Sequence, residues 1–182
     1  MNIILIGFAS SGKTSAAQAL SDKTGWPHLD LDRLVENRYE KTHREQLSCR
    51  ELFRKMGARG FTSLETEALG SLSELDSAIL STGGRTPLSE ENCRILRKLG
   101  KIVYLKTDFR TILLRMKEKG FPASIKGGEA EIETEWKMRH PVYRGLADVT
   151  ICNDSLSPEE TAAGIIEKLP PEVFHTSEKK EH

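Results

Sequence analysis

Short apolar runs alternate with amphipathic stretches along most of the chain. Apolar runs bounded by polar or turn residues are typical of buried strands, whereas apolar positions that recur every three or four residues predict helices. The apolar runs predict strands at residues 3–6, 28–31, 78–81, 102–105 and 149–152. The helical patterns fall at residues 14–24, 33–39, 50–56, 63–72, 89–99 and 109–119, and a last helix opens at Ser157-Pro158.

This order of elements predicts an α/β fold in which helices cover both faces of a parallel sheet of about five strands. Residues 120–133 lack a clear period and are rich in Gly, Lys and Glu, so we expect a mobile lid at approximately residues 117–135. We place a single domain at residues 1–169. Residues 170–182 are rich in proline and then charged, and we expect a disordered tail there.

Composition narrows the class of protein. The 182 residues contain 27 Lys and Arg against 27 Asp and Glu, a balance that argues against a general nucleic-acid binder. The first apolar run, residues 3–6, is too short for a signal peptide or a membrane span. Cys49, Cys93 and Cys152 are isolated and odd in number, which predicts reduced thiols and a cytoplasmic protein. None of them has a His at metal-ligand spacing, so we expect no zinc site.

The strongest motif follows the first predicted strand. Residues 7–14 read Gly-Phe-Ala-Ser-Ser-Gly-Lys-Thr and fit the phosphate-binding pattern G-x-x-x-x-G-K-[ST] at a strand-to-helix junction. Backbone N–H groups and the helix N-terminus of such a loop attract phosphate oxygens, Lys13 reaches the β- and γ-phosphates, and the Thr14 hydroxyl ligates Mg²⁺. We therefore predict ATP binding; the alternative is a glycine-rich turn that binds nothing. The predicted nucleotide contacts in this stretch are Gly7, Ala9, Ser10, Ser11, Gly12, Lys13, Thr14 and Ser15.

A phosphate-binding loop alone does not identify the reaction. The chain contains no N-K-x-D motif of the kind that GTPases use to recognise the base, and it is short for an AAA-type motor. The predicted strand at residues 78–81 continues into Thr82-Gly83-Gly84 without the acidic residue of a Walker B motif. A small-molecule kinase is the class that remains favoured.

Two carboxylates follow the second predicted strand. Leu29-Asp30-Leu31-Asp32 places both acids on one side of an extended segment, at the edge of a parallel sheet where ligands bind. One of the two carboxylates can hold Mg²⁺, directly or through water, and the other can accept the proton of an attacking hydroxyl. Of these two possible assignments we choose Asp30 for the metal, and Asp32 with Lys13 as catalytic residues. The alternative is that these acids only cap the next helix, with Asp32 as the N-cap.

Together with further motifs downstream, these residues resemble the shikimate kinase family across about residues 1–168. Residues 30–36 are similar to its D-x-D-x-x-I-E motif, and residues 57–65 to its G-E-x-x-F-R-x-x-E motif. Residues 81–84 resemble its glycine cluster, and residues 139–148 its R-x-P-x-Y…A-D segment. The motifs occur in the same order throughout.

The resemblance implies a three-layer P-loop kinase fold and transfer of the ATP γ-phosphoryl to the 3-hydroxyl of shikimate, a step toward aromatic amino acids. It also implies a monomer whose partner is a small molecule, with no nucleic acid or membrane. Arg115 would stack on adenine, or is an ordinary solvated residue. The implied acceptor contacts are Asp32, Phe61, Gly83, Gly84, Arg85 and Arg139.

Some of these assignments have structural alternatives. Arg139 would bind the shikimate carboxylate, or is a surface charge at a helix end. Phe61 walls the acceptor site or belongs to the core. Glu65 orients a neighbouring cation or lies on an exposed helix face.

Three positions depart from the family pattern. Thr62 stands where the family has an Arg that pairs with the shikimate carboxylate, a loss of about 2–4 kcal/mol if nothing replaces it. Arg85 replaces the third glycine of the cluster, so it either restores the missing charge or fills the site. Phe121 replaces a lid arginine that would contact phosphates.

These departures keep two other hypotheses open beside an active shikimate kinase. Thr62 and Arg85 change the charge of the acceptor site, which suits a kinase for a different small hydroxylated acceptor. Phe121 suits a nucleotide-binding protein without phosphotransfer.

Overall fold

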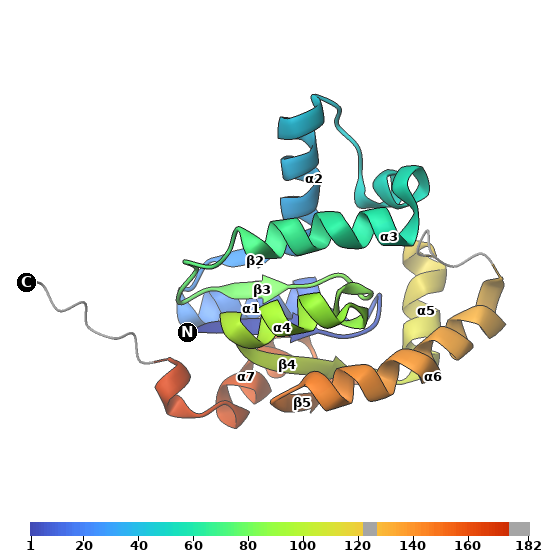
Figure 1. Ribbon diagram of the computed structural model, residues 1–182. Coiled ribbons are helices and arrows are strands. Elements are labelled where there is room, and N and C mark those ends of the chain that lie inside the picture. The colour runs from blue at the N-terminus through green and yellow to red at the C-terminus, as the bar shows by residue number, and fades with distance from the viewer. Residues whose placement is uncertain (122–126, 175–182) are drawn as a thin grey trace, which may run out of the picture.

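The computed structural model describes residues 1–121 and 127–174 of the chain. Within these residues, five parallel strands form one sheet in the order β2-β3-β1-β4-β5, with helices on both faces (Figure 1). The strands are β1 (Asn2–Ile6), β2 (His28–Asp30), β3 (Ile79–Ser81), β4 (Gly100–Lys106) and β5 (Val149–Cys152). The helices are α1 (Lys13–Thr24), α2 (Leu31–His43), α3 (Cys49–Gly70), α4 (Glu90–Leu99), α5 (Phe109–Lys119), α6 (Gly128–Leu146) and α7 (Pro158–Lys168). The predicted α/β class is confirmed.

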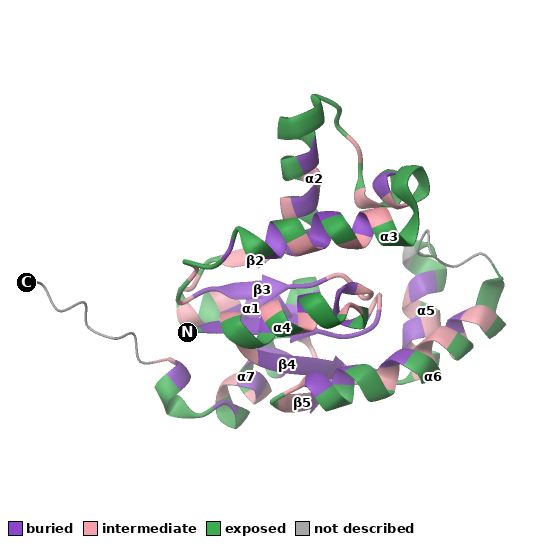
Figure 2. Cartoon of the chain, in the orientation of Figure 1, coloured by how far each residue is buried: buried purple, intermediate pink, exposed green. Residues whose placement is uncertain are grey.

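The central strand β1 explains why the strands read as continuous apolar runs. Its side chains alternate between two cores: Ile4 and Ile6 pack in a cluster with residues of α2, α3, α4 and α6, and Ile3 and Leu5 pack with residues of α1 and α7. All four side chains are fully buried. Figure 2 shows the neighbouring strands β3 and β4 as buried over most of their length. A strand covered on both faces needs apolar residues at every position, so no polar alternation is seen.

The glycine-containing motif after α2 is helical on both sides of a break. The sequence predicted two helices, at residues 50–56 and 63–72, and α3 (Cys49–Gly70) is indeed broken at Gly57. The second half begins directly after this break, five residues earlier than predicted. Gly57 has φ 70° and ψ −179°, a conformation that a glycine adopts without steric cost. The break turns the second half of α3 over the sheet, and Phe61 and Glu65 then point into the protein.

Helix α6 was not predicted. It begins at Gly128, so the expectation that residues 120–133 lack regular structure is wrong for residues 128–133. The period of apolar residues in this helix is hard to see in the sequence. Charged residues lie on most of its sides, a glycine pair stands at its start, and Pro141 lies inside it. Residues 122–126 of the expected lid lie outside the described residues.

The C-terminal boundary also differs from the expectation of a tail from Pro170. Pro171–Val173 form a short 3-10 turn in which Val173 is buried, and the Phe174 ring lies 5.8 Å from the Trp26 ring. Residues 170–174 therefore belong to the folded body. Residues 175–182 lie outside the described part of the chain.

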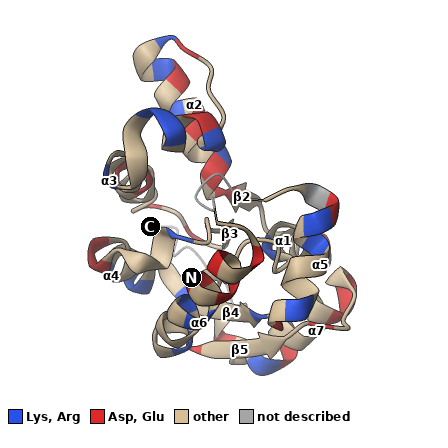
Figure 3. Cartoon of the chain, turned by 90° about the vertical axis from the view of Figure 1, so that its right-hand side faces the viewer, with Lys and Arg blue, Asp and Glu red and all other residues tan. Residues whose placement is uncertain are grey.

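Acidic and basic residues mix over the surface, as Figure 3 shows along α2. Cys49, Cys93 and Cys152 are free thiols, as predicted. In residues 1–121 and 127–174, no helix is both long enough and apolar enough to span a bilayer.

Candidate active site

The phosphate-binding loop connects β1 to α1 at the carboxyl edge of the sheet. Gly12 caps the helix with φ 91°, in the left-handed region that only glycine enters freely. The Lys13 side chain folds back over the loop, and its Nζ donates to the carbonyl oxygens of Gly7 at 3.0 Å and Phe8 at 2.8 Å. The residues predicted for nucleotide contact thus form one turn around the N-terminus of α1, where backbone N–H groups and the helix dipole favour an anion.

The electrostatics of Lys13 suit an anion as well. The side chain is buried, and this burial lowers its pKa to about 8, while the nearby carboxylates of Asp32 and Asp30 act in the opposite direction. The ammonium group is still mostly protonated at neutral pH. A bound polyphosphate would favour the protonated form further.

Asp30 ends β2 and bonds to three elements at once. Its Oδ1 accepts from the backbone N–H of Asp32 at 3.0 Å, and its Oδ2 accepts from Ser81 Oγ at 3.0 Å and from Thr14 Oγ1 at 3.2 Å. Helix α2 begins at Leu31, so Asp32 lies in the first helical turn instead of on an extended segment, and the N-cap is Asp30 instead of Asp32.

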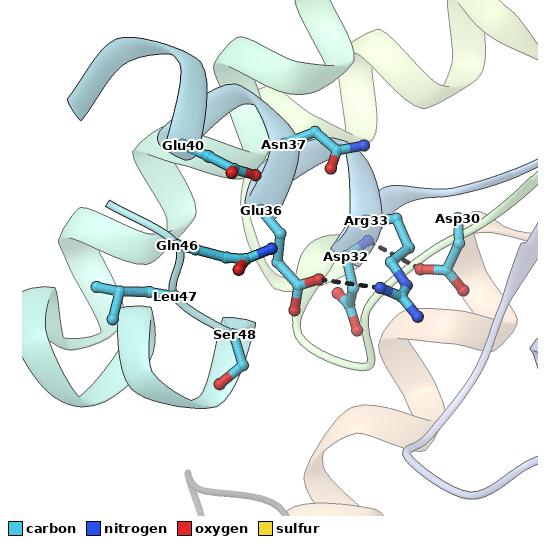
Figure 4. A pocket seen from close by; sticks show the side chains of 9 residues that line it. All are labelled: Asp30, Asp32, Arg33, Glu36, Asn37, Glu40, Gln46, Leu47 and Ser48. Carbon is cyan, nitrogen blue, oxygen red and sulfur yellow. Dashed lines mark hydrogen bonds and ion pairs between the residues drawn. The ribbon is translucent and has the colours of Figure 1, made fainter. Parts of the chain in front are cut away.

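Asp32 borders a cleft of about 530 Å³, seen from close by in Figure 4, where Arg33 and Glu36 lie next to it. Its side chain opens to this cleft, yet the surrounding chain removes much of its hydration. This desolvation and the negative charge of Asp30 raise the pKa of Asp32 to about 6, against the opposing charge of Lys13. Asp32 is therefore mostly a carboxylate at neutral pH and gains a proton just below it.

Thr14 and Asp30 are compatible with Mg²⁺. Their side-chain oxygens are 3.2 Å apart, and Mg²⁺ in nucleotide sites typically takes one or two protein oxygens along with phosphates and water. Among the described residues, no cluster of three or more His, Cys, Asp or Glu side chains could hold a metal ion by itself. The donor set thus fits a metal brought in with a nucleotide.

The glycine pair after β3 lies between the acidic residues and the phosphate-binding loop. A Cβ atom on Gly83 would lie 3.1 Å from Glu65 Oε1 and 3.3 Å from Asp32 Oδ1. A Cβ atom on Gly84 would lie 3.0 Å from the backbone nitrogen of Ala9. Residues without a side chain therefore allow three separate segments to meet here.

Glu65 is almost completely buried, at 1% exposure, so the alternative of an exposed helix face is wrong. Thr86 Oγ1 donates to its Oε1, and no described residue forms a hydrogen bond with its Oε2. Burial raises the pKa of Glu65 to about 7, and the charge of Asp32 adds to this, while the bond from Thr86 and the charge of Arg85 lower it. A buried carboxyl group close to Asp32 and Gly83 is thus about half protonated at neutral pH.

Arg139 is buried at 4% exposure, so it is not a surface charge. Its guanidinium lies 5.0 Å from the centroid of the ring of Phe8, a residue of the phosphate-binding loop. The Nη2 of Arg139 donates to Glu135 Oε2, one turn earlier on α6. The Nε of Arg139 has no hydrogen-bond partner among the described residues. Tyr143, on the same helix, donates its hydroxyl to the Gly84 carbonyl oxygen and ties α6 to the glycine pair.

Arg85, from the loop after β3, lies next to the same carboxylate of Glu135 as Arg139 does. Its guanidinium lies 5.9 Å from the centroid of the Phe53 ring, and its Nη1 is 3.7 Å from Glu135 Oε2. Phe61 is buried in the core cluster and meets Phe53 edge-on at 5.8 Å, so its core role is established and its contact with an acceptor stays a prediction.

The other two departures do not contribute a charge to the site. Thr62 is half-buried on α3, and its carbonyl oxygen accepts from Thr66 Oγ1. Phe121 is partly exposed, and its carbonyl oxygen accepts from Arg50.

The third arginine, Arg115, is half-buried beside the loop, and its Nη1 donates to the Ser10 carbonyl oxygen at 3.4 Å. Two further neighbours of this loop, Asn153 and Thr107, were not predicted from the sequence. Asn153 Nδ2 donates to the Ser11 carbonyl oxygen at 2.8 Å, and Thr107 Oγ1 donates to Asn153 Oδ1. Both residues directly follow a strand, and polar residues at that edge of a parallel sheet were a signal available in the sequence.

Comparison with known proteins places this site in context. A family model described as shikimate kinase matches residues 9–170. The shikimate kinase of Dictyoglomus turgidum is 34% identical over 172 residues, 92% of this chain and 96% of that protein. That of Enterococcus faecalis is 35% identical over 171 residues, 92% of this chain and 98% of that protein.

Solved structures of shikimate kinases are also similar to this chain. A shikimate kinase from Acinetobacter baumannii in complex with shikimate superposes with a TM-score of 0.80 at 29% identity, covering 91% of this chain and 90% of that one. A shikimate kinase from Aquifex aeolicus gives a TM-score of 0.75 at 31% identity, covering 92% of this chain and 95% of that one.

Proposed function

The chain belongs to the shikimate kinase family, and from this premise we infer that it transfers the γ-phosphoryl group of ATP to the 3-hydroxyl of shikimate. One observation carries the inference beyond family membership. The phosphate-binding loop, the Asp30–Asp32 pair and Arg139 meet at one edge of the sheet, joined through Gly83-Gly84. Such a site has a place for a polyphosphate, a proton acceptor and a cation for a substrate carboxylate.

On the nucleotide side, we propose that the backbone N–H groups of residues 7–12 and the Lys13 ammonium hold the β- and γ-phosphates. The loop conformation and the mostly protonated state of Lys13 support this. Arg115 and Asn153 flank the loop on the side where the adenosine would lie, which supports a role for both in holding it. The Asn153 amide also fixes the loop through Ser11.

We propose that Thr14 and Asp30 hold Mg²⁺ together with the phosphates. When bound, the ion supplies positive charge that neutralises the phosphates during transfer. The Asp30 carboxylate also fixes the first turn of α2, and therefore the position of Asp32, through its bond to the Asp32 N–H.

On the acceptor side, Asp32 orients the attacking hydroxyl and takes its proton. Its pKa of about 6 keeps it ionised at neutral pH, close enough to the working pH for efficient proton transfer. Phosphoryl transfer has a loose transition state, so the proton leaves late and the main work of Asp32 is positioning.

Arg139 binds the acceptor carboxylate, and Arg85 supplies a second guanidinium that Thr62 does not provide. The burial of Arg139 and its unpartnered Nε support a ligand at this point. We further propose that the chain works as a monomeric single domain in a reducing compartment, in keeping with its free thiols.

The test is turnover with ATP and Mg²⁺, measured as ADP release with shikimate and with a panel of sugar acids and polyols. We expect saturable turnover with shikimate as the best acceptor. A better acceptor from the panel would support the reading based on Thr62 and Arg85 and overturn shikimate as substrate. ATP binding in calorimetry without ADP release for any acceptor would point to a nucleotide-binding protein without phosphotransfer.

A further inference from the structure

Glu135 is a charged residue of the site that the proposed function does not use. It lies four residues before Arg139 on α6, a spacing that puts the two side chains on one face of the helix. Arg85 reaches the same carboxylate from the loop after β3, far away in the sequence. Two arginines from separate segments thus converge on one carboxylate oxygen, Oε2 of Glu135.

The surroundings make this an enclosed pair of arginines rather than a surface ion pair. Arg139 is 4% exposed, and the side chains of Arg85 and Glu135 are 33% and 28% exposed. The two guanidiniums lie near the rings of Phe8 and Phe53, which shield them from water. An ion pair in such a place is screened less than one on the surface.

The arginines also keep hydrogen-bonding capacity for a ligand. Each guanidinium carries five N–H donors in a planar fork that matches a carboxylate. The Arg139 Nε is buried and finds no acceptor in the described residues, although a buried donor without a partner is costly. Glu135 thus satisfies this pair of arginines only in part.

We propose that Glu135 is an internal competitor for the acceptor carboxylate and thereby sets how tightly the protein binds its acceptor. The inference rests on the proposed function, because Arg85 and Arg139 are the residues assigned to that carboxylate. In the free protein Glu135 pairs with both guanidiniums and offsets part of their positive charge. The incoming carboxylate takes over these donors, and Glu135 turns away into the partly open side of the site.

The sign of the effect follows from the charges. Like charges close together in a partly desolvated site repel each other, so Glu135 opposes the acceptor carboxylate. Glu135→Gln keeps the shape of the side chain, removes the negative charge and leaves both guanidiniums for the ligand. If Glu135 instead only held Arg139 in place, the Glu135→Gln variant would bind the acceptor more weakly than wild type.

The experiment is calorimetric titration of wild-type protein and Glu135→Gln with shikimate and with its uncharged methyl ester. We expect Glu135→Gln to bind shikimate roughly threefold to tenfold more tightly, the range of a partly buried ion pair. The methyl ester, which lacks the competing charge, should bind both proteins equally. Steady-state kinetics should show the same gain as a lower KM for shikimate with little change in kcat.

Glu133→Gln is the matched control. Glu133 forms another ion pair of the same spacing on α6, with Lys137 at 2.7 Å, but the side chains of Glu133 and Lys137 are 45% and 65% exposed. The Glu133→Gln variant should bind shikimate with the same affinity as wild type. Glu135→Ala, with folding checked by thermal unfolding, tests the same charge if the glutamine variant is unstable.

The outcomes separate the two proposals. Equal or weaker shikimate binding by both Glu135 variants, with wild-type binding intact, would overturn the role of Glu135 and leave the kinase function standing. An equal gain for the methyl ester would also overturn it, because the effect would not depend on the acceptor carboxylate. No shikimate binding by wild type or by either variant at millimolar ligand would overturn the proposed acceptor, and the inference with it.

Discussion

The buried carboxyl of Glu65 provides a quantitative test of the electrostatics of the site. Glu65 is almost fully buried, one of its oxygens has no partner among the described residues, and its pKa is raised from 4.5 to about 7. The folded protein therefore favours the neutral acid, whereas the unfolded chain ionises at the ordinary value. The stability that the neutral acid contributes is complete below about pH 4.5 and is lost as the pH rises through about 7.

The size of this effect can be worked out from the two pKa values. A difference between 4.5 and about 7, at about 1.36 kcal/mol for each pH unit, corresponds to about 3 kcal/mol of unfolding free energy at alkaline pH. Somewhat less than 1 kcal/mol of this is already lost at about pH 5. Between about pH 5 and pH 8.5, Glu65 should thus cost the folded protein about 2–3 kcal/mol.

The variant Glu65→Gln removes the titration and keeps the shape. We expect its unfolding free energy, relative to wild type, to rise by about 2–3 kcal/mol between about pH 5 and pH 8.5. Urea unfolding at both pH values measures this, and any constant cost of the amide cancels in the comparison. Glu67→Gln on the same helix, where Glu67 is 51% exposed and pairs with Arg38, should show almost no such change. A difference for Glu65→Gln that does not depend on pH would refute the reasoning.

Three further predictions concern catalysis. Asp32→Asn should lower kcat by about 10²–10⁴-fold and abolish the fall in kcat/KM for shikimate that wild type shows below about pH 6, because only the carboxylate takes the proton; a pH–rate profile measures this. Lys13→Met should lower kcat at least about 10³-fold in the ADP-release assay, since no other described ammonium lies within the loop. Arg139→Gln should raise the KM for shikimate by about 30-fold or more with little effect on the KM for ATP, whereas exposed Arg144→Gln on the same helix should change neither. A pH profile of Asp32→Asn that still falls below about pH 6 would contradict the role of Asp32. Retained turnover by Lys13→Met, or an unchanged KM for shikimate in Arg139→Gln, would contradict the role of that residue.

The features that could be predicted from the sequence depend on local pattern. Strands such as β1 are covered on both faces, so every position is apolar and the run is unmistakable. The phosphate-binding loop was predictable because its glycines and Lys13 act through backbone geometry within a few residues. The family match over residues 9–170 agrees with the motif order that first indicated it.

Contacts between distant segments could not be predicted in the same way. The buried positions Ile132, Tyr143 and Leu146 of α6 follow a helical spacing, but Arg139 interrupts this apolar stripe. The Phe8 ring that covers the Arg139 guanidinium comes near it only in the folded protein. The convergence of Arg85 on Glu135 likewise depends on where the loop after β3 meets α6. Asp32 lies in a helical turn because Asp30 caps α2, two residues before the N-cap that the sequence pattern implied.

The most direct test of the account identifies the product. After incubation of the protein with ATP, Mg²⁺ and shikimate, proton and phosphorus NMR show which carbon of the ring carries the phosphate. We expect one new phosphate ester whose phosphorus couples to the proton at C3, formed in step with ADP. Phosphate on another hydroxyl, or ADP and free phosphate with shikimate unchanged, would contradict it.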